Sequence, residues 1–157
     1  MNITIKELKT IRRIMLDLGA GDDLGGWCAI SSYAIVRAIV SRRGSVKIHN
    51  NRFHCFTEHD GFFVDISASQ FRADIHPIYV SPRPLTIDNG YNFAIHLSER
   101  DVVFKPGGIR RANSTLASIL KEWPEEQDPF RNVSLFRAIC SKLRSELDIG
   151  SVKLSFV

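Results

Sequence analysis

Cysteine is scarce in this chain: the 157 residues contain only three, at positions 28, 55 and 140. Their number is odd and their spacing is not that of a zinc site, so the sequence indicates neither a disulfide framework nor a metal centre. We therefore expect a reducing compartment, no bound metal and no cofactor. Any cysteine chemistry must depend on single thiols.

Long apolar runs are also missing. The first residues, MNITIKELKTIRR, carry charges where a signal peptide needs its apolar core, and no segment approaches the ~18 apolar residues of a membrane span. The sequence predicts a soluble protein that is cytoplasmic on synthesis and has no membrane partner. It leaves open secretion by a route that needs no signal peptide.

A concentrated basic surface is likewise absent, although the formal net charge is +4. The arginine pairs at 12–13, 42–43 and 110–111 lie far apart, and aromatic residues do not alternate with them. A solvated surface explains them better than a nucleic-acid interface, so no nucleic acid is expected as a partner. The glycine-rich stretch 19–26 is not a phosphate loop, because its glycine spacing is wrong and its two aspartates would repel phosphate.

Length and patterning predict one α+β domain over residues 1–157. A hydrophobic content of 44% is enough for a single sizeable core. Apolar residues at helical spacing predict an amphipathic helix over 4–18, a largely buried helix from Cys28 to about Val40, and a C-terminal helix over 133–147. A further short helix is expected near 113–122.

Short strand-like runs fill the middle of the chain. They cover residues 45–50, 52–59 and 61–67, with two further candidates at 76–82 and 91–97. Asp60-Gly61 is a typical signal for a two-residue hairpin turn. The order of helices, antiparallel strands and later helices is typical of an α+β fold.

Cys28 is expected in the first turn of the buried helix, directly after the glycine-rich loop. Unpaired backbone N–H groups and the positive end of the helix dipole favour a thiolate at such a position. A free cysteine is nevertheless among the residue types most often buried in a core. The position suits a nucleophile as well as an inert thiol, so partners elsewhere in the chain must decide.

The predicted hairpin offers two such partners, His54 and Asp65. With a two-residue turn, His59 lies opposite Phe62, and the alternation of side chains puts His54 and Asp65 on one face as diagonal neighbours. His59 and Cys55 then point to the other face. A turn with an odd number of residues, or a bulge, would reverse this choice.

Nucleophilic catalysis by cysteine needs a base within hydrogen-bond reach and a third group that orients the base. Each of the three residues has an ordinary structural alternative when taken alone: a core thiol, a buried histidine, a turn-capping aspartate. Together they predict a catalytic set, with Cys28 as nucleophile, His54 as base and Asp65 as orienting group.

The residues 54–58, HCFTE, and 61–67, GFFVDIS, resemble the transglutaminase-like pattern. In that pattern His-x-Trp-x-Glu, Gly-x-Trp and Asp-x-Thr follow a cysteine that begins a helix. The wider papain-like group of cysteine proteases, acyltransferases and glutamine deamidases, including several bacterial effector toxins, has the same Cys, His, Asp order. The resemblance covers about residues 20–70, and Phe56, Phe63 and Ser67 replace the pattern's residues conservatively.

This resemblance implies a papain-like or transglutaminase-like core and a cysteine-dependent acyl-transfer enzyme. The expected activity is that of an amide hydrolase, glutamine deamidase, protease or transglutaminase acting on a protein or peptide. The thiolate of Cys28 would attack a carbonyl, His54 would accept and then donate a proton, and the Cys28 backbone N–H would stabilise the oxyanion. No glutamine lies shortly before Cys28, so a second oxyanion donor is not identified.

By analogy, the small size and cytoplasmic start suit a bacterial effector or toxin, with a cognate inhibitor or immunity protein as a further partner. We also expect Trp27 and Phe56 at the walls of a substrate groove, although core packing is an open alternative for Phe56. Gln70 follows Asp65 closely, either as a hydrogen-bond donor at the site or as an anchor of its loop. The less regular segment 104–132 is a candidate cover for the site.

The alternative function is a protein-binding module that retains the fold without using the triad. The two differ in the behaviour of Cys28, because a thiol of ordinary acidity reacts slowly at mildly acidic pH.

Overall fold

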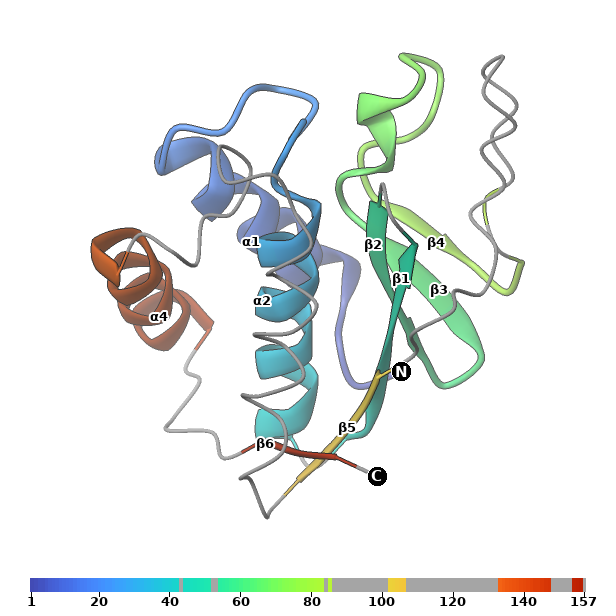
Figure 1. The fold of residues 1–157 in the computed structure, drawn as a ribbon, viewed down its shortest axis with the longest axis vertical. Helices are drawn as coiled ribbons and strands as arrows, with labels where there is room; N and C mark the ends of the chain where they lie inside the picture. The colour runs from blue at the N-terminus through green and yellow to red at the C-terminus, as the bar shows by residue number, and fades with distance from the viewer. Residues whose placement is uncertain are drawn as a thin grey trace.

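Helices and an antiparallel sheet form two sides of the molecule (Figure 1). The computed structural model describes residues 1–42, 44–51, 54–83, 85, 102–106, 133–147 and 154–156. Its elements are, in chain order, α1 (Ile5–Asp17), α2 (Cys28–Ser41), β1 (Val46–Asn51), β2 (His54–His59), β3 (Phe62–Asp65), the 3₁₀ turn η1 (Ala68–Gln70), β4 (Tyr79–Ser81), β5 (Val102–Pro106), α4 (Val133–Leu147) and β6 (Leu154–Phe156).

The predicted α+β class is confirmed over these residues. The expected strand at 91–97 and the expected helix at 113–122 lie outside the described residues, as does most of the segment 104–132. The strands β5 and β6 were not predicted. They extend the sheet on the side of β1, which gives the strand order β4-β3-β2-β1-β5-β6.

Helix α1 begins and ends close to its predicted limits. Thr4 caps it by accepting a hydrogen bond from the Glu7 backbone, and the Glu7 carboxylate accepts one from the Thr4 N–H in return. This capping box satisfies N–H groups that a helix start otherwise leaves unpaired. The apolar stripe of the helix is fully buried, and its members are Leu8, Ile11, Ile14 and Met15.

Helix α2 is the centre of the main core. It packs against one face of the sheet, and α1 and α4 lie on its other sides (Figure 1). The sheet residues that share this core are Val46, Ile48, Cys55, Val64 and Ile66. Because α2 is covered nearly all round, its sequence is small or apolar on almost every side.

The hairpin of β2 and β3 has the predicted two-residue turn. Asp60 and Gly61 have φ of 51° and 77°, the left-handed conformation that a tight hairpin turn requires and glycine adopts readily. The pairing of His59 with Phe62 and of Glu58 with Phe63 is the predicted register. The hairpin therefore places alternate side chains on the faces that the sequence indicated.

The opposite sheet face holds a second, smaller cluster. Phe56, Phe63, Ala68 and Ile75 form it, with Phe71, Tyr79 and Leu85 packed around them. The chain that follows β3 folds back over this face. The sheet is thus buried on both sides in this part of the molecule.

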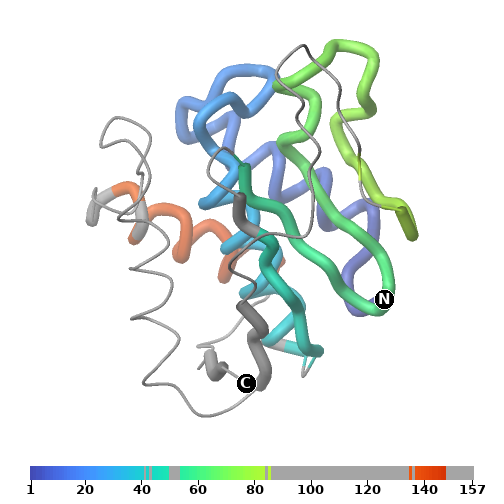
Figure 2. The backbone as a smooth tube through the Cα atoms, turned by 45° about the vertical axis from the view of Figure 1, so that its right-hand side comes forward, coloured from blue at the N-terminus to red at the C-terminus, as the bar shows by residue number. Residues whose placement is uncertain are grey.

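The start of α2, the start of β2, the end of β3 and η1 all lie at one end of the molecule, the upper end in Figure 1. The chain's N-terminus lies at the other end of the hairpin (Figure 2). There its ammonium group is 3.3 Å from Oδ2 of Asp60, and the Asn2 N–H donates to Nε2 of His59 at 3.0 Å. None of the described helices has the length and apolar character needed to cross a bilayer.

Candidate active site

His54 and Asp65 form a buried pair at the upper end of the hairpin. Nε2 of His54 lies 2.6 Å from Oδ2 of Asp65. His54 is 0% exposed and Asp65 is 4% exposed. The predicted sharing of one sheet face is therefore confirmed, since the two side chains meet directly.

The Asp65 carboxylate is fixed by the residue two positions further on. Its Oδ1 accepts hydrogen bonds from the Ser67 backbone N–H at 2.8 Å and from the Ser67 hydroxyl at 3.0 Å. Oδ2 is left to face His54. Because both oxygens are engaged, the carboxylate holds one orientation and so holds the imidazole ring.

Cys28 completes the group. Its side chain lies close enough to His54 to raise the pKa of the imidazole through hydrogen bonding and through charge. Since Nε2 of His54 faces Asp65, the nitrogen that serves Cys28 is Nδ1. All three residues predicted to be catalytic are thus in one connected group, although they come from the start of α2, the start of β2 and the end of β3.

The environment of His54 strongly favours its protonated form. Burial alone lowers the pKa of the imidazole, but the charge and the hydrogen bond of Asp65 outweigh this, and Cys28 adds to them. The balance raises the pKa of His54 from 6.5 to about 10. A ring that carries protons on both nitrogens at neutral pH stabilises a negative charge beside it.

The loop before α2 explains how Cys28 reaches this position. Leu24 is fully buried with a φ of 57°, and its carbonyl accepts the Trp27 N–H at 3.0 Å. Gly26 has a φ of 79°, which favours glycine at this turn. Trp27 is the N-cap of α2, and its side chain makes no capping hydrogen bond. Backbone N–H groups of the first turn, next to the thiol, are therefore not bound by the cap side chain.

Trp27, Phe56 and Gln70, the residues predicted to bind substrate, all lie around this group but differ in exposure. Trp27 is half-buried against the main core. Phe56 is only 2% exposed and stacks between His54 and His49, with ring centroids 6.0 Å and 5.0 Å away. The packing alternative therefore describes Phe56 better than an open groove wall.

Gln70 is brought close to His54. Its Nε2 donates to the Ser67 carbonyl at 2.9 Å and lies 3.5 Å from Nδ1 of His54, the outer limit of a hydrogen bond. The first contact anchors the 3₁₀ turn, and the second leaves the amide beside the nitrogen that faces Cys28. Gln70 thus makes a contact that anchors its loop and a contact beside the site, so both of its expected positions match the structure.

The remaining candidates of the hairpin are placed elsewhere. His59 and Cys55 point away from Asp65, as predicted, and His59 Nδ1 donates to the Ser45 carbonyl at 2.6 Å. Glu58, on the same strand, keeps 31% of its side chain exposed. Its Oε2 lies 2.6 Å from Nε2 of the fully buried His49, because β1 brings that histidine alongside.

Two neighbours of the site were not predicted. The Phe71 ring meets the His54 ring edge-on at a centroid distance of 4.8 Å. The Arg12 guanidinium of α1 donates to the backbone carbonyls of Asp22 and Ile66. Neither has a local sequence signal, since both contacts join segments that are distant along the chain.

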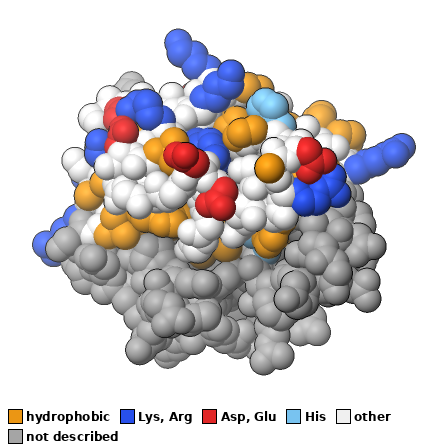
Figure 3. Space-filling view, turned by 90° about the horizontal axis from the view of Figure 1, so that it is seen from above, with side chains coloured by type: hydrophobic (Ala, Val, Ile, Leu, Met, Phe, Trp, Pro, Cys, Tyr) orange, Lys and Arg blue, Asp and Glu red, His pale blue; other side chains and the backbone are white. Residues whose placement is uncertain are grey.

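Acidic, basic and hydrophobic side chains all reach the surface at this end of the molecule (Figure 3). Over the described residues, no group of three or more histidine, cysteine or acidic side chains is arranged to hold a metal ion. All three cysteines are free thiols. The group of Cys28, His54 and Asp65 offers a thiol, an imidazole and a carboxylate.

Comparisons with protein-family models, with curated proteins and with solved structures find no match to this chain. The features of this chain that bear on its function are therefore its own, chiefly the placement of Cys28, His54 and Asp65.

Proposed function

We propose that this protein is a cysteine-dependent acyl-transfer enzyme with a papain-like or transglutaminase-like core. Its substrates would be carboxamide or peptide bonds of a protein or peptide. The observation that carries the proposal is the use of both nitrogens of His54. Nε2 is held 2.6 Å from Asp65, which leaves the other nitrogen for the Cys28 thiol, a group near enough at the start of α2 to raise the pKa of the ring.

The first half-reaction transfers the acyl group to the enzyme. Because the pKa of His54 is raised to about 10, the imidazole already holds the thiol proton before the substrate arrives, and the Cys28 thiolate attacks the carbonyl carbon of the substrate. The backbone N–H groups at the start of α2 stabilise the oxyanion of the tetrahedral intermediate. The C–N bond then breaks, the imidazolium gives its proton to the leaving amine or ammonia, and a thioester remains on Cys28.

The second half-reaction releases the acyl group. His54 removes a proton from the incoming nucleophile, which attacks the thioester carbonyl, and the C–S bond breaks to return the thiol. Water as the nucleophile gives hydrolysis or deamidation, and an amine gives transamidation. Asp65 and Ser67 hold the ring in one orientation through both steps.

Because Cys28, His54 and Asp65 are buried, a substrate cannot reach them without some movement of the protein. Cys28 is 2% exposed, so a substrate reaches the sulfur only after covering side chains move. The same burial favours the second candidate function, a protein-binding module in which Cys28, His54 and Asp65 stabilise the fold. The two functions differ in whether the thiol accepts an acyl group and passes it on.

An activated ester separates them without knowledge of the natural substrate. Incubation with p-nitrophenyl acetate should give a burst of p-nitrophenolate from acylation of Cys28, followed by steady turnover as the thioester is hydrolysed. The acetyl group should be found on Cys28 by mass spectrometry. His54→Ala should lose both phases, and His49→Ala, which alters the other buried histidine on this sheet face, should keep them.

Two results would contradict the enzymatic proposal. If Cys28 gains no acetyl group under conditions that acetylate unfolded protein, the thiol is not a nucleophile in the fold. If the acetyl group forms on Cys28 but is never released, the protein has a reactive thiol without a functional base, and the binding module is the better account.

A further inference from the structure

The proposed active site is assembled from two separate parts of the chain. Cys28 follows the loop between α1 and α2, whereas His54 and Asp65 belong to the hairpin. A Cys–His hydrogen bond requires these two parts to be held at a fixed separation. Displacement of a reacting group by even ~1 Å can cost on the order of a hundredfold in rate.

Arg12 of α1 connects the two parts. One terminal nitrogen of its guanidinium donates to the carbonyl of Asp22, in the loop that leads to Cys28. The other terminal nitrogen donates to the carbonyl of Ile66, the residue directly after Asp65. A single side chain, fixed on a rigid helix, thus binds the backbone on both sides of the site.

The electrostatic surroundings of Arg12 agree with this bridging position. Burial lowers the pKa of the guanidinium, while the charges of Asp23, Asp22 and Asp65 raise it. Arg12 is therefore within electrostatic range of the carboxylate that orients His54. Its charge balances acidic groups from both parts of the site, which draws the loop and the strand end together.

We propose that Arg12 is a positioning residue, which sets the separation of the Cys28 thiol from the His54 imidazole by binding the backbone beside each part. This inference rests on the proposed function, since positioning matters only if the pair reacts. Arg12 touches neither reacting group. Its effect should appear in the reactivity of Cys28 and not only in the stability of the fold.

The planar guanidinium suits this task. Its N–H donors point in fixed directions, so two carbonyls can be bound at once, whereas the lysine ammonium is a point charge on a flexible stem. Arg12→Lys should therefore retain the positive charge but lose one of the two connections. The lysine variant separates the effect of charge from the effect of bridging.

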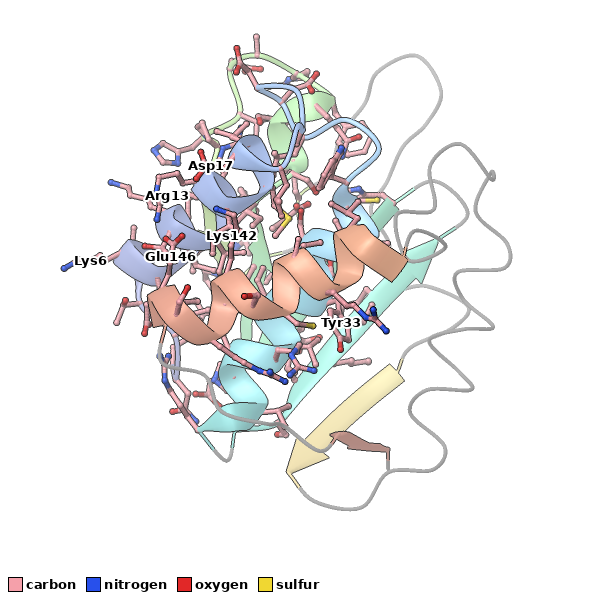
Figure 4. All side chains as sticks on the ribbon, turned by 90° about the vertical axis from the view of Figure 1, so that its left-hand side faces the viewer. Lys6, Arg13, Asp17, Tyr33, Lys142 and Glu146 are labelled. Atoms are coloured by element: carbon pink, nitrogen blue, oxygen red, sulfur yellow. The ribbon has the colours of Figure 1, made fainter. Side chains whose placement is uncertain are left out.

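Arg13 provides a matched control on the same helix. It pairs with Asp17 at 3.0 Å and with Glu146 of α4, and these three side chains lie between α1 and α4, away from the hairpin (Figure 4). Arg13→Ala removes the same charge and side chain from α1 as Arg12→Ala. It leaves the connection between the loop and the strand end intact.

The test is the rate of Cys28 alkylation by iodoacetamide from pH 5 to pH 9, in a Cys55→Ser, Cys140→Ser background, with thermal unfolding measured in parallel. At pH 6, Arg12→Ala should slow alkylation at least about tenfold, which is about 1.4 kcal/mol. Its pH profile should move toward that of a free thiol. The alkylation rate of Arg12→Lys should lie between those of the parent and Arg12→Ala. The rate of Arg13→Ala should stay within about twofold of the parent rate, even if its melting temperature falls.

Millimolar guanidinium should restore part of the rate in Arg12→Ala and none in His54→Ala, which a purely structural loss would not show. The inference is overturned if the folded Arg12 variants keep the parent rate and pH profile, or if Arg13→Ala changes them equally. If Arg12→Ala does not fold, Arg12→Lys decides by the same criteria. A parent rate that is independent of His54 would instead overturn the proposed function, so the two failures are distinguishable.

Discussion

Cys28 and Cys55 are two thiols in the same core with the same exposed fraction, 2%. Cys28 begins α2 and lies close enough to His54 to raise the pKa of its imidazole. Cys55 lies within β2 and faces the main core, where burial and then the charges of Cys28 and Asp65 raise its pKa. Exposure therefore does not distinguish the proposed nucleophile from a core thiol, whereas the neighbours of each thiol do.

The two cysteines also differ in how their distance from His54 along the chain relates to their position in space. Cys55 is the immediate neighbour of His54 in sequence, but strand alternation turns it to the other face. Cys28 is far from His54 in sequence and meets it because α2 and β2 begin at the same end of the molecule.

Replacement of each cysteine by alanine should give the largest contrast. Cys28→Ala should lower turnover of p-nitrophenyl acetate at least about a thousandfold, because the nucleophile is lost. Cys55→Ala should leave it within about threefold, since that thiol lies outside the reaction. Steady-state release of p-nitrophenolate measures both, and equal losses would remove the distinction between the thiols.

The next comparison is between His54 and His49, two buried histidines on the same face of the sheet. Each is 2.6 Å from a carboxylate, and Cys28 is among the groups that raise the pKa of His54. His54→Ala should slow alkylation of Cys28 at pH 6 about a hundredfold, within the usual range for loss of a base. His49→Ala should change it by less than about threefold, and a comparable effect of His49→Ala would show that local packing controls the thiol.

The Asp65→Asn variant tests the ion pair through stability. The pKa of His54 is raised from 6.5 to about 10, so the pair's contribution is complete below about pH 6.5 and is lost as the pH rises through 10. Loss of one partner of a buried pair costs roughly 3–5 kcal/mol. Urea unfolding should show this loss at pH 6 and a much smaller difference near pH 10; a constant difference would refute the assigned coupling.

The smallest effect concerns Cys55 as a core residue. Cys55→Ala removes one buried sulfur and should lower the free energy of unfolding by about 1 kcal/mol, a typical cost for a core substitution. Alkylation of Cys28 should not change. Chemical denaturation and labelling of the same samples measure the two effects separately, and a change in labelling would mean that the cysteines act together.

The sequence predicted the parts of the site that depend on short-range rules. Strand alternation and the Asp60-Gly61 turn correctly placed His54 with Asp65, and the glycine-rich loop correctly placed Cys28 in the first turn of α2. These features follow from residues close together in the chain, for which the side-chain period and the turn type decide the outcome.

Short-range rules did not predict the contacts between segments that are distant along the chain. The Arg12 connection joins α1 to the end of β3, and the pairing of Glu58 with His49 depends on the register of β1 against β2. The strands β5 and β6 take their place in the sheet through partners far along the chain. Local pattern and propensity carry little information about such pairings, because tertiary contacts determine them.

The most direct test is to follow both thiols in one molecule, with Cys140→Ser as the only cysteine substitution. Iodoacetamide labelling of Cys28 and Cys55 is measured by peptide mass spectrometry between pH 5 and pH 9, with and without His54→Ala. The account predicts fast labelling of Cys28 well below pH 8, slow labelling of Cys55 throughout, and loss of the difference in His54→Ala. Equal slow labelling of both thiols, with a free-thiol pH profile that His54→Ala does not change, would contradict it.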